Sequence, residues 1–514
     1  MSEPLVPRVI TEPVGGSALA GLAQRGEAPP GWYEPAPRDR EGWLARARAI
    51  AAEGTAARTL RALGSALHAR GAAAERIARV VRDGGIVVTT GQQPGLFGGP
   101  VYTWTKAIGA AAMAEALERA TGISTAAVFW AATDDADALE ASQTVIAVPG
   151  GAERLVAEVR APAGTPMCAA PLGDVGPLFA RLAESSGSAL HSDALDVTRG
   201  AYHAGSTVGD AFVALLASFL NPLGVAVLDA GSPLVRELAA PVTTAALDRA
   251  PAVARALAER AAALRAAGFE PQVEEIDKLS LVFDWSGGVK TRVPVDALAR
   301  SRPTELSPNV LLRPVVERAL LPTVAYLAGP GELAYFAQVS AVASALDAAQ
   351  PLAIARWSCT IVEPRVERAL ARLRLGLDDV RDGARAERII AERAIPEAAR
   401  RAIDAARRHA AALGEALAPL AADERLIDER VVAGHRRRAE WEAARLERRL
   451  LAAVKRRETE AMQQLGTVRG SLWPLGVRQE RALNFIPLLA RYGPPLLERM
   501  RAAAAEWARA RIGE

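Results

Sequence analysis

Short apolar runs that alternate with longer helical stretches dominate roughly the first 360 residues. The β-branched run Ile86–Thr90 lies between glycines, which predicts a buried strand. A helical pattern follows at residues 103–119, and a second apolar run at 126–130 predicts another strand. Strand, helix and strand in this order form a βαβ unit with parallel strands and a right-handed crossover.

The same order recurs further along the chain. Predicted strands at residues 225–228 and 323–327 are each followed by a glycine-containing loop and a helix. Repeated units of this kind predict an α/β fold with a doubly wound, Rossmann-like parallel sheet. Two less regular segments, at about residues 144–200 and 270–300, mix short strands with glycine and proline. We expect them to form small lobes inserted into this core.

One uncharged stretch, residues 211–228, approaches the length of a membrane span. Asn221-Pro222 and Gly224 interrupt it, and proline breaks a helix at such a position. The stretch therefore predicts a buried helix that ends near Leu220 and a strand after it, with no membrane segment.

The character of the chain changes at about residue 362. From there to residue 466 it is rich in Ala, Arg, Glu and Leu, a composition typical of long helices. Leu446, Leu450 and Val454 form an apolar stripe with a spacing of four residues, which favours an antiparallel helical hairpin or coiled coil that supports a homodimer. The predicted domains are an irregular and helical segment 1–60, a core 61–361, a coiled-coil arm 362–466 and a segment 467–514 that packs back on the core.

Charge and cysteine content exclude several classes of function. The 514 residues include 62 basic and 59 acidic side chains, a net charge of +3, and we find no compact basic run with interleaved aromatic residues in the first 360, so nucleic acid is not a predicted partner. The amino terminus shows no signal-peptide pattern. Cys168 and Cys359 are far apart, and the five histidines lack metal-ligand spacing, so we predict no metal site and a cytoplasmic protein.

The loop 91–100, Gly-Gln-Gln-Pro-Gly-Leu-Phe-Gly-Gly-Pro, joins the first predicted strand to its helix. Glycines allow backbone N–H groups to turn toward a ligand, and the helix amino terminus favours negative charge. The loop matches neither the P-loop nor the dinucleotide-binding pattern. It therefore predicts a site for an anion or a small polar ligand, while a tight turn that only packs the helix stays open as an alternative.

Two further loops carry candidate chemistry. Asp134, Asp135 and Asp137 follow the second strand, where carboxylates could hold an amine, a metal or a ribose hydroxyl, or could be a solvated helix cap. The loop 329–332, Gly-Pro-Gly-Glu, repeats the strand–glycine–helix order of the first loop. If its strand is parallel to the first, both loops lie at the same sheet edge, where open α/β sheets bind ligands. A helix start with Glu332 in its first turn is the alternative.

Longer motifs resemble those of one known family. The run from Thr90 to Thr103, with Lys106 after it, resembles the TGQQAGLFTGPLYT signature of the bacillithiol biosynthesis cysteine-adding enzymes. Further agreement follows in the same order along the chain, at residues 128–130, 307–314, 321–335 and 479–484. The resemblance runs from about residue 30 to the carboxyl terminus.

The resemblance implies a Rossmann-like core, inserted lobes and a coiled coil that supports a dimer. It also implies a ligase-like enzyme that adds L-cysteine to the amine of an amino-sugar malate, glucosaminyl-malate. A carboxylate is a poor electrophile and needs activation, for which ATP is a candidate, although the sequence does not identify a cofactor. The candidate catalytic residues are Gln92, Asp135 and Asp137. The candidate substrate-binding residues are Gly91, Gln93, Gly95, Phe97, Gly98, Gly99, Tyr102, Lys106, Trp130, Asn309, Arg313, Tyr326, Gly329, Gly331, Glu332 and Tyr335.

One departure from the family pattern concerns the loop after the second strand. The family usually reads EDHDFxEIN there, whereas this chain has Ala136 in place of the histidine, Ala138 in place of the aromatic residue and Ser142 in place of the asparagine. Two alternatives therefore stay open: a divergent homologue that ligates another amine or uses a nucleotide, and a homologue that binds a small molecule without catalysis.

Overall fold

A computed structural model describes residues 6–274, 276, 278–296, 302–422 and 427–514. The chain divides into two compact units. The core unit comprises Met1–Ile146, Arg154–Val362 and Gln479–Glu514, and the arm unit comprises Ala147–Glu153 and Glu363–Arg478.

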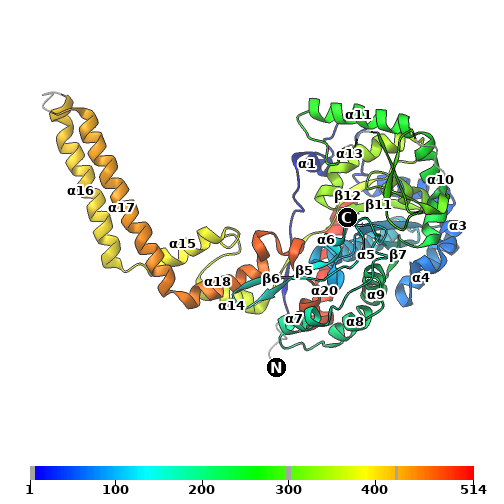
Figure 1. The fold of residues 1–514 in the computed structure, drawn as a ribbon, viewed down its shortest axis with the longest axis horizontal. Helices are drawn as coiled ribbons and strands as arrows, with labels where there is room; N and C mark the ends of the chain where they lie inside the picture. Colours follow the sequence, from blue (N-terminus) through cyan, green and yellow to red (C-terminus); the bar gives the residue numbers. More distant parts are fainter. Residues whose placement is uncertain (1–5, 275, 277, 297–301, 423–426) are drawn as a thin grey trace. The chain divides into compact units, whose positions relative to one another are not determined.

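A six-stranded sheet, in the order β12-β11-β3-β4-β7-β2, forms the centre of the core unit (Figure 1). Neighbouring strands from β12 to β7 are parallel, and only the short edge strand β2 is antiparallel. This confirms the doubly wound, mostly parallel sheet that the repeated strand–helix order predicts. The strands are β2 Leu67–His68, β3 Ile86–Gln92, β4 Thr125–Ala131, β7 Val225–Asp229, β11 Thr323–Ala328 and β12 Ala353–Ala355.

Helices cover both faces of this sheet. On one face, side chains of α4, α10, α12 and α13 share a core cluster with Val87 of β3 and Val128 of β4. On the other face, α5 packs on β3 and β4 and is itself covered by α20. The helices of the core unit are α1 Ala18–Arg25, α2 Arg40–Ala52, α3 Thr55–Ala62, α4 Gly71–Asp83, α5 Val101–Thr121, α6 Ala138–Ala141, α7 Gly176–Ser186, α8 Asp193–Ala201, α9 Val208–Leu220, α10 Pro233–Asp248, α11 Ala250–Ala266, α12 Arg313–Leu320, α13 Pro330–Ala345, α19 Gln479–Ala482 and α20 Ile486–Ile512.

The uncharged stretch folds as predicted, because α9 ends at Leu220 and β7 begins at Val225. No helix in the described part of the chain is long and apolar enough to cross a membrane. The lobe predicted at about 270–300 contains a hairpin, in which β8 Leu279–Asp284 pairs with β9 Thr291–Pro294. The strand β10 Leu306–Pro308 extends this sheet on the other side of β8. The end of the predicted lobe, 297–300, lies outside the described residues.

The amino-terminal segment and the segment 144–200 both contain elements that the sequence did not predict, although short strands were expected in the second. The amino-terminal segment contains α1 and a strand, β1 Arg8–Thr11, which pairs with β13 Cys359–Val362. The segment 144–200 contains α7 and α8 as well as strands β5 Gln143–Val148 and β6 Gly151–Val156. The partner of β1 lies far away in the sequence, so no local pattern could have predicted this strand.

The arm unit consists mainly of helices: α14 Pro364–Leu373, α15 Gly383–Ala394, α16 Glu397–Ala422, α17 Glu429–Arg457 and α18 Thr459–Leu472. As Figure 1 shows, α16 and α17 form the predicted antiparallel hairpin. The predicted stripe on α17 is buried only at its carboxyl-terminal end, where Val454 packs with Ile395 while Leu446 is 59% exposed.

Candidate active site

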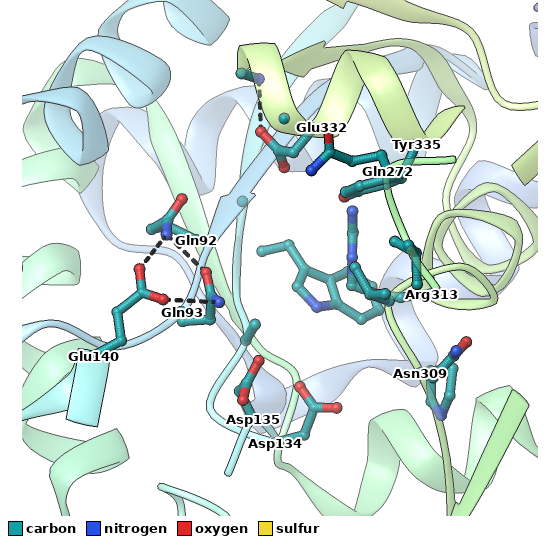
Figure 2. Close-up of a pocket in the computed structure, with 18 of the residues that line it drawn as sticks. Gln92, Gln93, Asp134, Asp135, Glu140, Gln272, Asn309, Arg313, Glu332 and Tyr335 are labelled. Atoms are coloured by element: carbon teal, nitrogen blue, oxygen red, sulfur yellow. Dashed lines mark hydrogen bonds between the residues drawn. The ribbon is translucent and has the colours of Figure 1, made fainter. Parts of the chain in front are cut away.

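A cavity of about 960 Å³ opens where β3, β4 and β11 reach their carboxyl ends. This is the edge at which open α/β sheets bind ligands. Figure 2 shows carboxylate, amide, guanidinium and phenol groups arranged around it. Among the residues predicted from the sequence, those that line the cavity are Gly91, Gln92, Gln93, Tyr102, Lys106, Trp130, Asp135, Asn309, Arg313, Tyr326, Gly329, Gly331, Glu332 and Tyr335.

The second half of the glycine loop does not line this cavity. Residues Leu96–Gly98 form a short 3-10 helix, in which the Phe97 ring is fully buried against Phe179 and Tyr202. The Gly98 N–H donates to the Tyr202 hydroxyl (3.2 Å), and that hydroxyl donates to the Gly95 carbonyl (3.1 Å). The backbone groups that we expected to face a ligand are therefore used inside the protein.

Asn484 holds the same half of the loop from the other end of the sequence. Its fully buried amide nitrogen contacts the carbonyls of Leu96, Phe97 and Gly99 at 3.0–3.4 Å. The prediction that Gly95, Phe97, Gly98 and Gly99 bind substrate directly is thus wrong. For this half, the alternative of a tight turn that packs the chain is the correct description.

A buried ion pair connects the first loop to the Gly-Pro-Gly-Glu loop. Lys106 Nζ lies 2.6 Å from Glu332 Oε2 and also donates to Gly91 O (2.7 Å) and Gln92 Oε1 (3.0 Å). Glu332 further accepts from the Gly329 N–H (2.6 Å) and the Tyr326 hydroxyl. Burial alone would raise the pKa of Glu332, but the attraction of Lys106 and these hydrogen bonds lower it, so Glu332 is a carboxylate. The pair fixes both loops at the cavity.

Asp135 lies on the loop after β4, which the rest of the core unit holds in place. Its carbonyl accepts the N–H of Met167 (2.8 Å), and Lys290 Nζ donates to the adjacent Asp134 carbonyl (2.7 Å). The Asp135 carboxylate accepts the N–H of Asp137 (2.9 Å) and forms no ion pair with a described residue. Burial, followed by the negative charge of Asp134, raises the pKa of Asp135 above its ordinary value.

Asp137, predicted as catalytic, does not line the cavity. It is the N-cap of α6, and its Oδ1 accepts the N–H of Glu140 at 2.9 Å. The alternative of a helix cap is therefore correct for this residue.

Glu140 is a cavity residue that we did not predict. Its carboxylate lies 3.2 Å from Gln93 Nε2 and 3.4 Å from both Gln92 Nε2 and the Tyr102 hydroxyl (Figure 2). Burial raises the pKa of Glu140, and the charges of Asp137 and Asp135 add to this effect. Its position three residues after an N-cap indicated only the start of a helix, and the contact with the two glutamines depends on the tertiary structure.

The β8–β9 hairpin also contributes residues that we did not predict. Lys290 lies over the Phe283 ring (4.7 Å) and is 3.5 Å from Asp134 Oδ2. Arg292 donates from Nε to the Ser280 carbonyl (2.7 Å). Both cations line the cavity, and only the general prediction of a lobe over the sheet edge anticipated them.

Arg313 and Arg356 are two buried cations of the cavity wall. Arg313 pairs with Glu317 (2.7 Å), and its guanidinium lies over the Tyr326 ring (5.0 Å). Arg356 binds both carboxylate oxygens of Glu480 (2.8 and 2.9 Å). Near them, Trp130 lines the cavity, and its buried indole N–H has no hydrogen-bond partner among the described residues.

The described residues contain no group of three or more His, Cys, Asp or Glu side chains that could hold a metal ion. Cys168 and Cys359 are free thiols. Burial, with the charges of Asp229 and Asp134, raises the pKa of Cys168 to about 12, so its thiol is protonated at neutral pH and is a poor nucleophile.

Comparison with known proteins gives a consistent result over nearly the whole chain. Residues 31–357 match the family model described as "Bacillithiol biosynthesis BshC, N-terminal Rossmann-like domain". Residues 359–507 match the model described as "Bacillithiol biosynthesis BshC, C-terminal coiled-coil domain".

Individual relatives agree with these matches. Proteins named "Putative cysteine ligase BshC" are similar to this chain in three bacteria. The one from Koribacter versatilis is 32% identical over 462 residues, 84% of this chain and 85% of the relative. The one from Solibacter usitatus is 30% identical over 460 residues, which cover 85% of this chain and 86% of the relative. The one from Symbiobacterium thermophilum is 30% identical over 551 residues, 96% of both chains.

Proposed function

This chain belongs to the BshC family of bacillithiol biosynthesis, and from that premise we propose that its cavity is the active site of a ligase that adds L-cysteine to the amine of glucosaminyl-malate. The single observation that carries the proposal is the presence of opposite charges in one cavity. A carboxyl group with a raised pKa, Asp135, lies in the same cavity as cationic side chains from the β8–β9 hairpin. An amino-sugar malate presents the complementary groups, an amine and two carboxylates.

Amide formation needs the amine in its neutral form. The amine nitrogen forms a bond to the carboxyl carbon of cysteine, one carboxyl oxygen leaves with the group that activates it, and the nitrogen loses a proton. A general base is most effective when its pKa is near the working pH, and burial moves the pKa of Asp135 in that direction. We assign Asp135 as the proton acceptor.

The departure at Ala136 is consistent with this assignment. Ala136 lines the cavity but offers only a methyl group where the family pattern has a histidine. No histidine is among the residues that line the described cavity. The Asp135 carboxylate, next to Ala136 in the sequence, is placed to accept the proton that an imidazole could otherwise accept.

The proposal is tested by mass spectrometry of the full chain incubated with cysteine and glucosaminyl-malate, with and without ATP. We expect the cysteine adduct from the unchanged protein and at least a 100-fold slower rate from Asp135→Asn, which keeps the size but loses the base. Asp248→Asn, at an exposed helix end, is the matched control and should retain the full rate. Product formation at an unchanged rate by Asp135→Asn would refute its role, and no product from the folded, unchanged protein would refute the acceptor.

We also propose that the chain forms a homodimer through the arm unit. Trp441 and Leu446 on α17 are 54% and 59% exposed, which is unusual for side chains of this size. A second copy of the helical hairpin would cover them. Light scattering coupled to size exclusion should give twice the chain mass of 54.0 kDa, and the single chain mass for a Trp441→Glu, Leu446→Glu variant. A dimer that persists in this variant would place the interface elsewhere.

A further inference from the structure

Six cationic side chains line the described part of the cavity, and they differ in whether the protein neutralises them. Lys106, Lys290, Arg313 and Arg356 each lie within 3.5 Å of a carboxylate oxygen, from Glu332, Asp134, Glu317 and Glu480 respectively. Arg292 and Arg481 have no such partner among the described residues. Because an uncompensated charge in a cavity favours a ligand of opposite charge, these two guanidinium groups are the places for bound anions.

Two contacts of its guanidinium group hold Arg292 in a fixed orientation. Its Nε donates to the Ser280 carbonyl, and the group lies over the Phe283 ring at 5.2 Å. Neither terminal nitrogen has a hydrogen-bond partner among the residues that the structure describes. Arg292 is half-buried, and burial lowers its pKa, with no opposing effect from a carboxylate of the described residues. A ligand carboxylate would provide the missing counter-charge.

The position of Arg292 keeps these nitrogens accessible. It lines both the main cavity and an adjoining cavity of about 330 Å³, so open space lies on either side of it. Glu274 lines the same two cavities and forms no ion pair with a described residue. Asn309, which also lines both cavities, is labelled in Figure 2 on the side of the cavity opposite the two glutamines.

Arg481, on α19, lines the cavity together with Tyr102, and its side chain is exposed. Burial and then Glu140 raise the pKa of the Tyr102 phenol, and the charge of Arg481 opposes them. Tyr102 in turn contacts Glu140, which lies beside Gln92 and Gln93 in Figure 2. Arg481 and Glu140 therefore line the same cavity, and a cation and a carboxylate there match the carboxylate and ammonium groups of a free amino acid.

We propose that the two arginines divide the substrates between them: Arg292 binds the dicarboxylate arm of the acceptor, and Arg481 binds the carboxylate of the amino acid. This inference rests on the proposed function for the identity of the two substrates. It assigns each substrate to one side of the cavity, with Asp135 and the Lys106–Glu332 pair contributing the wall that both substrates share.

Calorimetric titration of the full chain with L-malate and, separately, with L-cysteine under reductant tests the division without requiring turnover. Arg292→Gln should weaken malate binding at least tenfold and change cysteine binding less than twofold, and Arg481→Gln should do the reverse. Arg119→Gln, an exposed arginine at the end of α5, is the matched control and should change neither. Arg292→Lys keeps the charge without the forked geometry and should bind malate with intermediate affinity.

The other outcomes decide separately between the division of the substrates and the proposed ligation. Equal loss of both ligands in either variant, or malate binding that survives Arg292→Gln, overturns the division. Failure of the unchanged protein to bind malate, while it still forms the cysteine adduct, overturns the role of Arg292 and leaves the proposed function intact. If each variant weakens only its own ligand as expected but the unchanged protein forms no adduct, the two anion sites are supported and the proposed ligation is refuted.

Discussion

The two halves of the glycine-rich loop both contain glycines but have opposite roles. Gly91, Gln92 and Gln93 line the cavity, and the glutamine amides contact Glu140 and Lys106. Leu96–Gly99 turns away from the cavity and is bound by Tyr202 and Asn484. Glycine content therefore does not identify a ligand cradle by itself, because the same backbone freedom serves a buried turn equally well.

The largest expected effect that would test this difference between the two loop halves is a loss of folding stability. Phe97→Ala removes a fully buried ring and should lower the free energy of unfolding by about 3–5 kcal/mol. Urea unfolding followed by circular dichroism measures this loss. Phe97→Leu, which retains most of the apolar volume, should lose clearly less, and a loss below about 1 kcal/mol for the alanine variant would show that this half of the loop is not structural.

Asn484→Ala should have the next largest effect. It leaves the buried carbonyls of Leu96, Phe97 and Gly99 without their shared donor, at a cost of about 1–3 kcal/mol. The same unfolding measurement applies, with Asn484→Asp as a variant of equal size that lacks the donor. Unchanged stability in both variants would contradict the role given to this amide.

Gln92→Ala should show the opposite behaviour. Its side chain is only partly buried and lies at the cavity, so we expect a stability change of about 1 kcal/mol or less. The rate of adduct formation should fall at least tenfold, because Lys106 and Glu140 lose a common partner. A stability loss as large as that of Phe97→Ala would remove the distinction between the two halves.

The smallest expected effect concerns the pH dependence of the cavity-facing Asp135. Because its pKa is raised on folding, the folded protein holds this proton more tightly than the unfolded chain. Its contribution to stability is present below the ordinary aspartate pKa of about 3.9 and is lost as the pH rises through the higher, folded value. The proposed base must be ionised, so kcat/KM should rise over the same interval.

Asp135→Asn provides the control for this prediction. It should remove the contribution of Asp135 to the pH dependence of unfolding and should be slightly more stable than the unchanged protein at pH 7. Unfolding curves between pH 4 and 8 measure both effects. An unchanged pH profile in the variant would contradict a raised pKa at this position.

Local patterns were sufficient for most of the sheet. The β-branched run at 86–90 and the apolar runs at 126–130, 225–228 and 323–327 all became buried parallel strands, because such segments are covered on both faces. The strand at Arg8–Thr11 was missed because it depends on pairing with Cys359–Val362.

The sequence by itself determined the order of strands and helices along the chain. It also placed three loops at one sheet edge, because the carboxyl ends of parallel strands joined by right-handed crossovers lie at the same edge. Only the tertiary structure decided which side chains of those loops face the cavity. Asp137 caps α6 at the surface and the Gly95–Gly99 half packs inside the protein, while Glu140, Lys290, Arg292 and Arg481 line the site. The cap at Asp137 is a local contact that the sequence offered as an alternative, but the packing of the glycine loop against Tyr202 and Asn484 depends on residues distant in the sequence, and no local pattern records it.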